Sequence, residues 1–302
     1  SEMCIRDRYS RGSFPGAVNI PLDEFEERME SVDREKMSGW RKAGVTRLSF
    51  GVQSANDREL GFLGRLHDFS QAKSAVETAA QVGFRHISCD IMLGVKGQTL
   101  ESLWDSIESL TALPVDHISA YMLKIEKGTA FDCDEMRNAV ADDDMLCDMY
   151  LQTVGQLASK GFLQYEISNF AKEGGKSRHN LKYWHGEEYI GIGPSAHSFF
   201  DNERYYCKSD VEEFISDKVQ SMVVLEDDPD KAEEYVMLGL RLTEGIDINK
   251  AEELGGKELG ENIRKKAALF QKQGLCVVEK GILRLTPAGF LASNSIIGEL
   301  LW

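Results

Sequence analysis

Three strand-like segments separated by helix-like segments constrain the fold more than any other feature of the sequence. VTRLSFGV at Val45–Val52 is rich in β-branched and aromatic residues, and HISCDIMLG and HISAYMLKI begin at His86 and His117. Between them lie QAKSAVETAAQV and LESLWDSIESLTAL, for which Ser70 and Thr99 are the expected N-caps. Strands joined through helices pair in parallel by right-handed crossovers. We therefore predict an α/β fold, as part of an open sheet or of a barrel.

The rest of the chain predicts a helix, a strand and a smaller second domain. DDDMLCDMYLQTVGQLASK at residues 142–160 is the helix, and QYEISNF at Gln164–Phe170 is the strand. The composition changes near Tyr205. Helices are expected beyond this point at residues 210–217, 230–242, 249–254 and 258–272. A hairpin turning at Lys280–Gly281 and a final helix with Thr286 as N-cap and Pro287 at N1 complete a winged-helix-like domain.

Charge and cysteine usage exclude several classes of protein. The formal net charge is −15, which disfavours nucleic acid and anionic membranes as partners. No apolar run approaches the roughly 20 residues of a membrane span, and no signal peptide is visible; peripheral membrane contact stays open. The six cysteines are scattered without a CxxC pair, which is typical of a reducing compartment. We expect a cytoplasmic protein.

The segment HNLKYW offers one candidate site. If His179 opens a short helix, Arg178 and Lys182 share one face, and His179 and Tyr183 share the next. An imidazole, two cations and two large aromatics suit heme, with His179 as the axial ligand to iron, cations for the carboxylates and rings for stacking. The alternative is structural, because a Tyr-Trp pair after an amphipathic turn is usually core and a lone histidine is usually a hydrogen-bonded residue.

The chain resembles a known family from about Gly39 to Trp302. The matching segments are RLSFGVQS, LGRLH, CDIMLGVKGQT, DHISAYMLKIEKGT, YEISNFA, SRHNLKYWHGEEYIGIGPSAHS, LGLRLTEGI and RLTPAGFLASNS. In this order they resemble the radical S-adenosylmethionine (SAM) family of oxygen-independent coproporphyrinogen III oxidases, and most of all its heme chaperone branch, HemW. The resemblance implies a radical SAM barrel followed by a HemN-type C-terminal domain.

The same resemblance implies two groups of site residues. Gln53, Arg65 and Asp90 match the family's SAM contacts, and Gln53 and Asp90 lie where α/β scaffolds place ligand contacts. An Asp90–Arg65 structural ion pair is the alternative, because a buried carboxylate needs a partner. The heme-associated pattern comprises His179, Asn180, Tyr183 and Trp184, with Arg178 and Lys182 beside them. His197 in GPSAHS is a weaker candidate for the same pocket, and His185 is a substitute ligand.

The chain also departs from the family. A radical SAM enzyme holds a [4Fe–4S] cluster through three thiolates in CxxxCxxC, and that motif is absent here. The resemblance begins at the fourth of the six βα units of the family barrel, so a partial barrel with the last three units is expected. Lys96 replaces the usual proline of the GLPGQT loop. Catalysis is not expected from this chain, and SAM binding rests on an incomplete site.

The N-terminal residues resemble a different family. SFPGAVNIPL lies within residues 11–36, which resemble a rhodanese fragment without its catalytic cysteine, and residues 1–10 look like an artefactual leader. The expected domains are therefore 1–10, 11–36, a partial barrel at 37–205 and the winged-helix-like domain at 206–302. An unpaired barrel edge would make the isolated chain marginally stable or prone to aggregation.

Four functions follow from these expectations. The first is a heme chaperone that holds heme for transfer to an acceptor protein. The second is a coproporphyrinogen III oxidase-like SAM-dependent oxidoreductase of porphyrin biosynthesis, against which the missing cysteines argue. Sulfur transfer by the rhodanese-like segment and a non-catalytic interaction module are the others.

Overall fold

The structure, a computed structural model, describes residues 34–125, 131–137, 139–216, 222–227 and 229–302. The expected leader at 1–10 and most of the rhodanese-like segment at 11–36 lie outside these residues. The described chain forms two compact units that divide between Lys176 and Ser177. This division comes earlier in the chain than the boundary between residues 205 and 206 drawn from composition.

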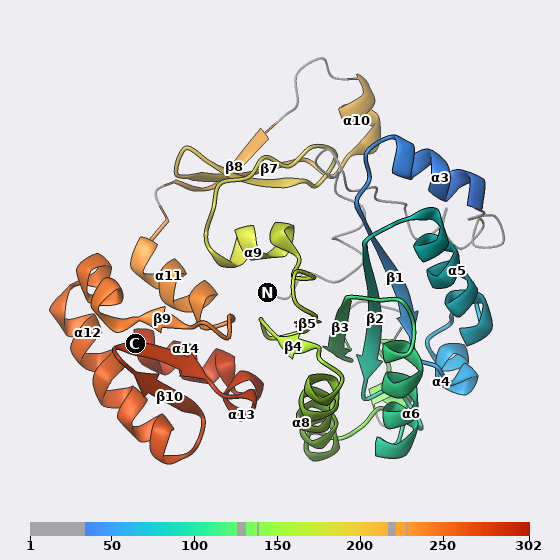
Figure 1. Ribbon diagram of the computed structural model, residues 1–302. Helices are drawn as coiled ribbons and strands as arrows, with labels where there is room; N and C mark the ends of the chain where they lie inside the picture. Colours follow the sequence, from blue (N-terminus) through green and yellow to red (C-terminus); the bar gives the residue numbers. More distant parts are fainter. Residues whose placement is uncertain (1–33, 126–130, 138, 217–221, 228) are drawn as a thin grey trace. The chain divides into compact units, whose positions relative to one another are not determined.

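The unit that ends at Lys176 is built on a five-stranded sheet of order β1-β2-β3-β5-β4 (Figure 1). Its strands are β1 (Arg47–Gln53), β2 (His86–Leu93), β3 (His117–Met122), β4 (Leu163–Gln164) and β5 (Asn169–Ala171). Strands β1, β2 and β3 are parallel, which confirms the α/β prediction. The single strand expected over Gln164–Phe170 is wrong. The chain reverses between β4 and β5, which pair antiparallel, and β5 also runs antiparallel to β3.

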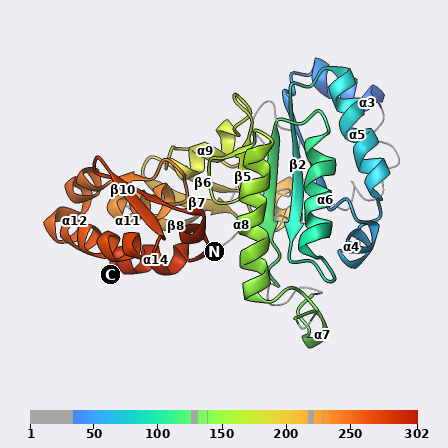
Figure 2. The ribbon, with the colours of Figure 1, turned by 60° about the horizontal axis from the view of Figure 1, so that its bottom comes forward.

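Helices cover one face of this sheet. The helices described in this unit are α3 (Arg34–Lys42), α4 (Asp57–Phe62), α5 (Phe69–Val82), α6 (Leu100–Thr111), α7 (Asp134–Arg137) and α8 (Asp143–Ser159). Of these, α5 contacts β1 and β2, and α8 contacts β2 and β3. Figures 1 and 2 show α5, α6 and α8 along the same side of β1, β2 and β3. Thr99 caps α6 as predicted. The cap of α5 is Asp68 rather than Ser70, because Asp68 forms a reciprocal capping box with Gln71.

The unit from Ser177 onward begins with a short helix and a sheet that the sequence did not predict. The helix is α9 (Arg178–Trp184), and the sheet has the order β6-β7-β8, with β6 (His197–Phe200), β7 (Glu203–Cys207) and β8 (Met222–Asp227). A two-residue turn with positive φ at Asp201 and Asn202 joins β6 to β7. This is the turn geometry that hairpins favour, so the Asp-Asn pair between aromatic runs was the available signal.

The remainder of this unit matches the predicted winged-helix-like arrangement. It contains α10 (Val211–Ser216), α11 (Lys231–Gly239), β9 (Ile246–Asp247), α12 (Ile248–Lys272), β10 (Cys276–Glu279), β11 (Ile282–Leu285), α13 (Pro287–Leu291) and α14 (Ser293–Leu301). The β10–β11 hairpin turns at Lys280–Gly281, and Thr286 caps α13, both as predicted. The two helices expected at 249–254 and 258–272 are the halves of α12, which kinks at Gly256. No helix of the described residues is long and apolar enough to cross a membrane.

Candidate functional site

The face of the five-stranded sheet opposite the helices carries polar side chains. In β2, Cys89 and Ile91 are at most 1% exposed, and they alternate with the buried polar residues Ser88 and Asp90. Successive side chains of a strand point to opposite faces. The apolar row therefore faces α5 and α8, which contact β2, and the polar row lies on the helix-free face.

One row of polar residues continues across this face. Asp90 is in register with Ser119 of β3, and Ser119 is in register with Asn169 of β5. On the β1 side, Ser49 donates a hydrogen bond of 3.3 Å from Oγ to Asp90 Oδ1. Asp90, Ser119 and Asn169 are each at most 4% exposed. Sequence reasoning missed Ser119 and Asn169, although polar residues at alternate positions of HISCDIML and HISAYM were a signal for such a face.

Gln53 ends β1 in an unusual conformation. Its φ is +68°, a left-handed backbone value that is rare and strained outside glycine and asparagine. The side chain is 3% exposed, and Oε1 has no hydrogen-bond partner among the described residues. Gly51 leaves room for it, because a Cβ at that position would lie 2.8 Å from Gln53 Nε2. Strain and an unsatisfied buried oxygen together are typical of a ligand-binding position.

The structure places the three residues expected to contact SAM in one unit. Gln53 and Asp90 lie on the neighbouring strands β1 and β2, where Gln53 is in register with Ile91, the residue after Asp90. Arg65 follows α4 and is half-buried. Its backbone N–H donates to Leu60 O and closes the helix end. The strand positions of Gln53 and Asp90 suit a shared ligand.

A buried carboxylate links the two loops that follow β1 and β2. Glu59 of α4 is 2% exposed. It accepts hydrogen bonds from Ser54 Oγ at 2.7 Å, Ser102 Oγ at 2.7 Å and Gln98 Nε2 at 3.0 Å. Ser106 lies 3.3 Å from Ser54 and extends the network into α6. Glu59 makes no ion pair within the described part of the chain, so neutral donors satisfy its charge and fix the segment after Gln53.

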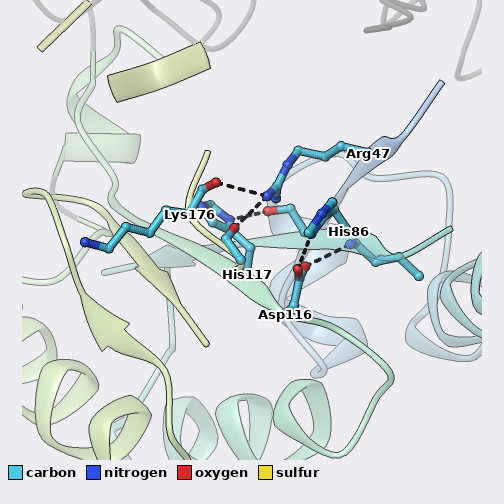
Figure 3. A network of polar contacts seen from close by, with 8 residues as sticks. Arg47, His86, Asp116, His117 and Lys176 are labelled. Atoms are coloured by element: carbon cyan, nitrogen blue, oxygen red, sulfur yellow. Dashed lines mark hydrogen bonds and ion pairs between the residues drawn. The ribbon is translucent and has the colours of Figure 1, made fainter. Parts of the chain in front are cut away.

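A second polar network lies at the amino ends of the parallel strands (Figure 3). Arg47 donates from Nη2 to the carbonyl oxygens of Gly175 at 2.6 Å and Lys176 at 3.3 Å. Asp116 Oδ2 lies 2.6 Å from His86 Nδ1. In barrels of βα units this end of the strands serves stability, whereas ligands bind at the carboxyl ends. We therefore assign the network to holding the loop at residues 172–176.

His117 is buried beside this network. Its Nδ1 lies 2.6 Å from Ser88 Oγ, and its Nε2 lies 2.8 Å from Tyr165 OH. Burial, and secondarily the positive charge of Arg47, lower the pKa of His117 to about 3. The ring is therefore neutral near pH 7, and one nitrogen donates while the other accepts. Both ring nitrogens have hydrogen-bond partners within the protein, which indicates a structural role.

Helix α9 carries the HNLKYW segment with the predicted geometry. The N-cap is Ser177, whose Oγ accepts a hydrogen bond from the backbone of the first turn. His179 and Tyr183 share a face: Tyr183 OH lies 3.0 Å from His179 Nε2, and the rings meet edge to face with centroids 5.0 Å apart. Tyr183 also packs edge to face against Tyr189 at 4.6 Å. The imidazole is therefore held in place by aromatic residues.

The pKa of His179 is shifted in the direction that favours a metal ligand. Partial burial lowers its pKa, and the positive charge of Lys182 lowers it further. The neutral imidazole is the form that coordinates metals. Because Nε2 faces Tyr183 OH, coordination through Nε2 requires that this hydrogen bond be exchanged for the bond to iron. Tyr183 is 38% exposed, which leaves room for that exchange.

The two cationic residues of α9 differ in whether they form an ion pair. Lys182 forms a 2.8 Å ion pair with Glu187. Arg178 is exposed and makes no ion pair with any residue that the structure describes. Asn180 and Trp184 are half-buried. In the segment after the helix, Ile190 and Ile192 are 41% and 55% exposed, which adds apolar surface near the motif in sequence.

The two other histidines considered as ligands have contacts of their own. His185 Nε2 lies 2.6 Å from Glu244 Oε1. The ring of His197 stacks on Tyr206 with centroids 5.3 Å apart. Both residues belong to the same unit as α9, but neither hydrogen-bonds to His179 within the described structure. His179 therefore remains the first candidate.

The cysteines do not fit an iron–sulfur cluster. Cys89, Cys207 and Cys276 are buried, and burial raises the pKa of each thiol. Cluster ligation needs closely placed thiolates. In the described ranges, no three His, Cys, Asp or Glu side chains are grouped to hold a metal ion, and Cys4 lies outside those ranges. The cysteines of the described ranges therefore do not supply the ligands of a cluster.

Two family models match the sequence. The model of the radical SAM superfamily matches residues 21–110, and the model of the HemN C-terminal domain matches residues 227–292. The first match begins inside residues 11–36, which sequence reasoning assigned to a rhodanese-like fragment. The first match includes β1 and β2 of the five-stranded unit, and the second includes most of the winged-helix-like part of the second unit.

Individual relatives extend over most of the chain. The heme chaperone HemW of Bacillus subtilis is 33% identical over 289 residues, covering 93% of this chain and 76% of that protein. HemW of Mycobacterium tuberculosis is 32% identical over 90% of this chain and 70% of its own length. Among solved structures, coproporphyrinogen III oxidase (HemN) from Escherichia coli, described as a radical SAM enzyme, aligns with a TM-score of 0.69 and 16% identity, covering 90% of this chain and 68% of that one. The last comparison concerns the fold alone.

Proposed function

We propose that this chain, which belongs to the HemW branch of the radical SAM family, is a heme chaperone. It binds heme at helix α9 and passes it to an acceptor protein. The observation that carries the proposal is the arrangement of His179 in HNLKYW. The His179 imidazole, whose Nε2 lies 3.0 Å from Tyr183 OH, belongs to an exposed helix that also carries Arg178 and Lys182. These residues supply a nitrogen for iron, aromatic surface and cations for the heme carboxylates.

A hemin titration followed by absorption tests this proposal. Wild-type protein should bind hemin saturably with a defined Soret band, because a fixed axial nitrogen gives one ligation state. His179→Ala should shift or abolish that band and weaken binding at least tenfold. Featureless binding that is equal in the two proteins would contradict the proposal.

Two matched variants identify the ligand. His185→Ala removes an imidazole that is engaged with Glu244, and His197→Ala removes one that stacks on Tyr206. If His179 is the ligand, both variants retain the wild-type Soret band. A band lost in either variant and kept in His179→Ala would transfer the ligand role to that histidine.

A second function, SAM binding, is supported by the helix-free face of the five-stranded sheet. Gln53 supports it most directly, because its backbone is strained and its buried Oε1 has no partner among the described residues. Asp90 lies on the neighbouring strand, and Arg65 is the remaining expected contact. Isothermal titration with SAM should show binding to the wild-type chain and at least tenfold weaker binding to Gln53→Met. No heat of binding to the wild type would contradict a SAM site.

An oxidase-like reaction on coproporphyrinogen is the less supported alternative. It would need a [4Fe–4S] cluster, and the cysteines of this chain do not supply the three neighbouring thiolates. Anaerobic reconstitution with iron and sulfide is expected to load no cluster. Loading of four irons per chain with SAM cleavage would overturn that expectation.

A further inference from the structure

Two buried amide oxygens of the five-stranded unit have no hydrogen-bond partner among the described residues. They are Gln53 Oε1 at the end of β1 and Asn169 Oδ1 at the start of β5. The side chains are 3% and 2% exposed. A buried acceptor without a donor destabilises the folded protein, so each such group in a native structure calls for an explanation. One explanation is a bound ligand that donates hydrogen bonds from its own N–H or O–H groups.

Other buried amides of the same unit are satisfied by the protein. Gln98 donates from Nε2 to Glu59 Oε2 at 3.0 Å, and its Oε1 accepts from Gly94 N at 2.7 Å. Gln156, 4% exposed, donates from Nε2 to Trp104 O at 3.0 Å. The lack of a partner is therefore not a general property of buried amides in this fold.

The strand register places Asn169 on the face to which the SAM site is assigned. Asn169 pairs with Ser119, and Ser119 pairs with Asp90. Paired residues of neighbouring strands point to the same face of a sheet. Asn169 therefore continues the polar row of Asp90 and Ser119, and at about 4.8 Å per strand it lies roughly 10 Å from β2. A small organic molecule lying across the strands can span that distance.

We infer that Asn169 is a ligand-contacting residue of this site, whose Oδ1 accepts a hydrogen bond from an ammonium, amino or hydroxyl group of the bound molecule. The inference rests on the proposed SAM binding, and it extends the site from β1 and β2 to β5. SAM belongs to the required chemical class, because it carries an ammonium group, an amino group and two hydroxyl groups. Gln53 Oε1 accepts a hydrogen bond from a second donor group of the same ligand.

The test combines the stability of the ligand-free chain with its affinity for SAM. Asn169→Leu removes the oxygen and keeps a similar side-chain volume. Without ligand, its thermal unfolding midpoint should equal or exceed that of the wild type, because an unsatisfied buried group is lost. Its dissociation constant for SAM, measured by isothermal titration, should rise at least tenfold. Asn169→Asp keeps an acceptor and should bind SAM within about threefold of the wild type.

The matched control is Gln156→Met, which removes an amide that the protein itself satisfies. It should lower the unfolding midpoint and leave SAM affinity unchanged. A midpoint for Asn169→Leu that falls as far as that of Gln156→Met would overturn the inference, and so would wild-type SAM affinity in Asn169→Leu. Failure of SAM to bind the wild-type chain is a different result, because it would remove the SAM site as a whole together with this role for Asn169.

Discussion

Arg47, the first residue of β1, donates a 2.6 Å hydrogen bond from Nη2 to the carbonyl oxygen of Gly175, 128 residues further along the chain. The same nitrogen reaches Lys176 O at 3.3 Å. Lys172 N also donates to Asp116 O at 2.9 Å. The loop at residues 172–176 is therefore fixed to the amino ends of β1 and β3, immediately before the sequence enters HNLKYW.

Replacing Arg47 should destabilise the first unit. Arg47→Met keeps the aliphatic stem but leaves two carbonyl oxygens without their charged donor, which should cost about 1.5–3 kcal/mol in the free energy of unfolding measured with urea. Arg41→Met is the control, because Arg41 donates a single 3.2 Å hydrogen bond to Gly83 O at an exposed site. The control should change stability by less than about 0.5 kcal/mol. Equal effects in the two variants would argue against a fixed loop.

Gly175→Ala tests the close approach of the same loop to β3. A Cβ at residue 175 would lie 2.4 Å from Asp116 O, so the backbone must move, at an expected cost of about 1–3 kcal/mol. Gly155→Ala is the control, because Gly155 lies inside α8 and a Cβ there meets no atom within 4 Å. That variant should gain about 0.5–1 kcal/mol through helix propensity. Wild-type stability of Gly175→Ala would contradict close packing of the loop against the residue before β3.

The buried His117 should make stability fall at acidic pH. Its folded-state pKa is about 3, against an ordinary value of about 6.5. Between these two values the unfolded chain binds a proton at His117 and the folded chain does not. The free energy of unfolding is therefore highest above about pH 6.5 and falls by up to 1.4 kcal/mol per pH unit toward pH 3. Urea unfolding at a series of pH values should show this slope. His117→Gln should be less stable at pH 7 and have a shallower slope; an unchanged slope would assign the dependence to other groups.

Removing the Glu59 carboxylate should loosen the segment after Gln53. Glu59→Leu removes the shared acceptor of the hydrogen bonds from Ser54, Ser102 and Gln98, and the expected loss is about 2–4 kcal/mol. Glu59→Gln keeps one acceptor oxygen and should lose less. Glu77→Gln is the control, because its 3.9 Å pair with Lys73 is exposed and should contribute less than about 0.5 kcal/mol. Wild-type stability of Glu59→Leu would mean that water replaces the carboxylate.

The sequence predicted those parts of the fold whose signals are local. The strands at His86 and His117, the Thr99 cap and the Lys280–Gly281 turn each depend on residues within one element or one turn. The geometry of HNLKYW was equally predictable, because i, i+4 spacing alone places His179 beside Tyr183.

The remaining features depend on residues that are distant in sequence. The register of Asn169 with Ser119 follows from pairing across about 50 residues, which no local pattern encodes. Glu59 meets Gln98 only after two βα units have packed. The roles of Gln53, Arg65 and Asp90 in binding SAM, and of His179 in binding heme, stay predictions for the titrations above.

The ion pair between Lys182 and Glu187 should limit heme affinity. Lys182 Nζ lies 2.8 Å from Glu187 Oε2, so a heme carboxylate must compete with Glu187 for the same cation. Glu187→Gln should therefore strengthen hemin binding by about two- to fivefold at low salt, the range that an exposed ion pair allows. Lys182→Met should weaken binding and cancel the gain when the two changes are combined. Additive effects in this double-mutant cycle would show that Lys182 does not meet the heme carboxylates, and Arg178 would then be the cation to test.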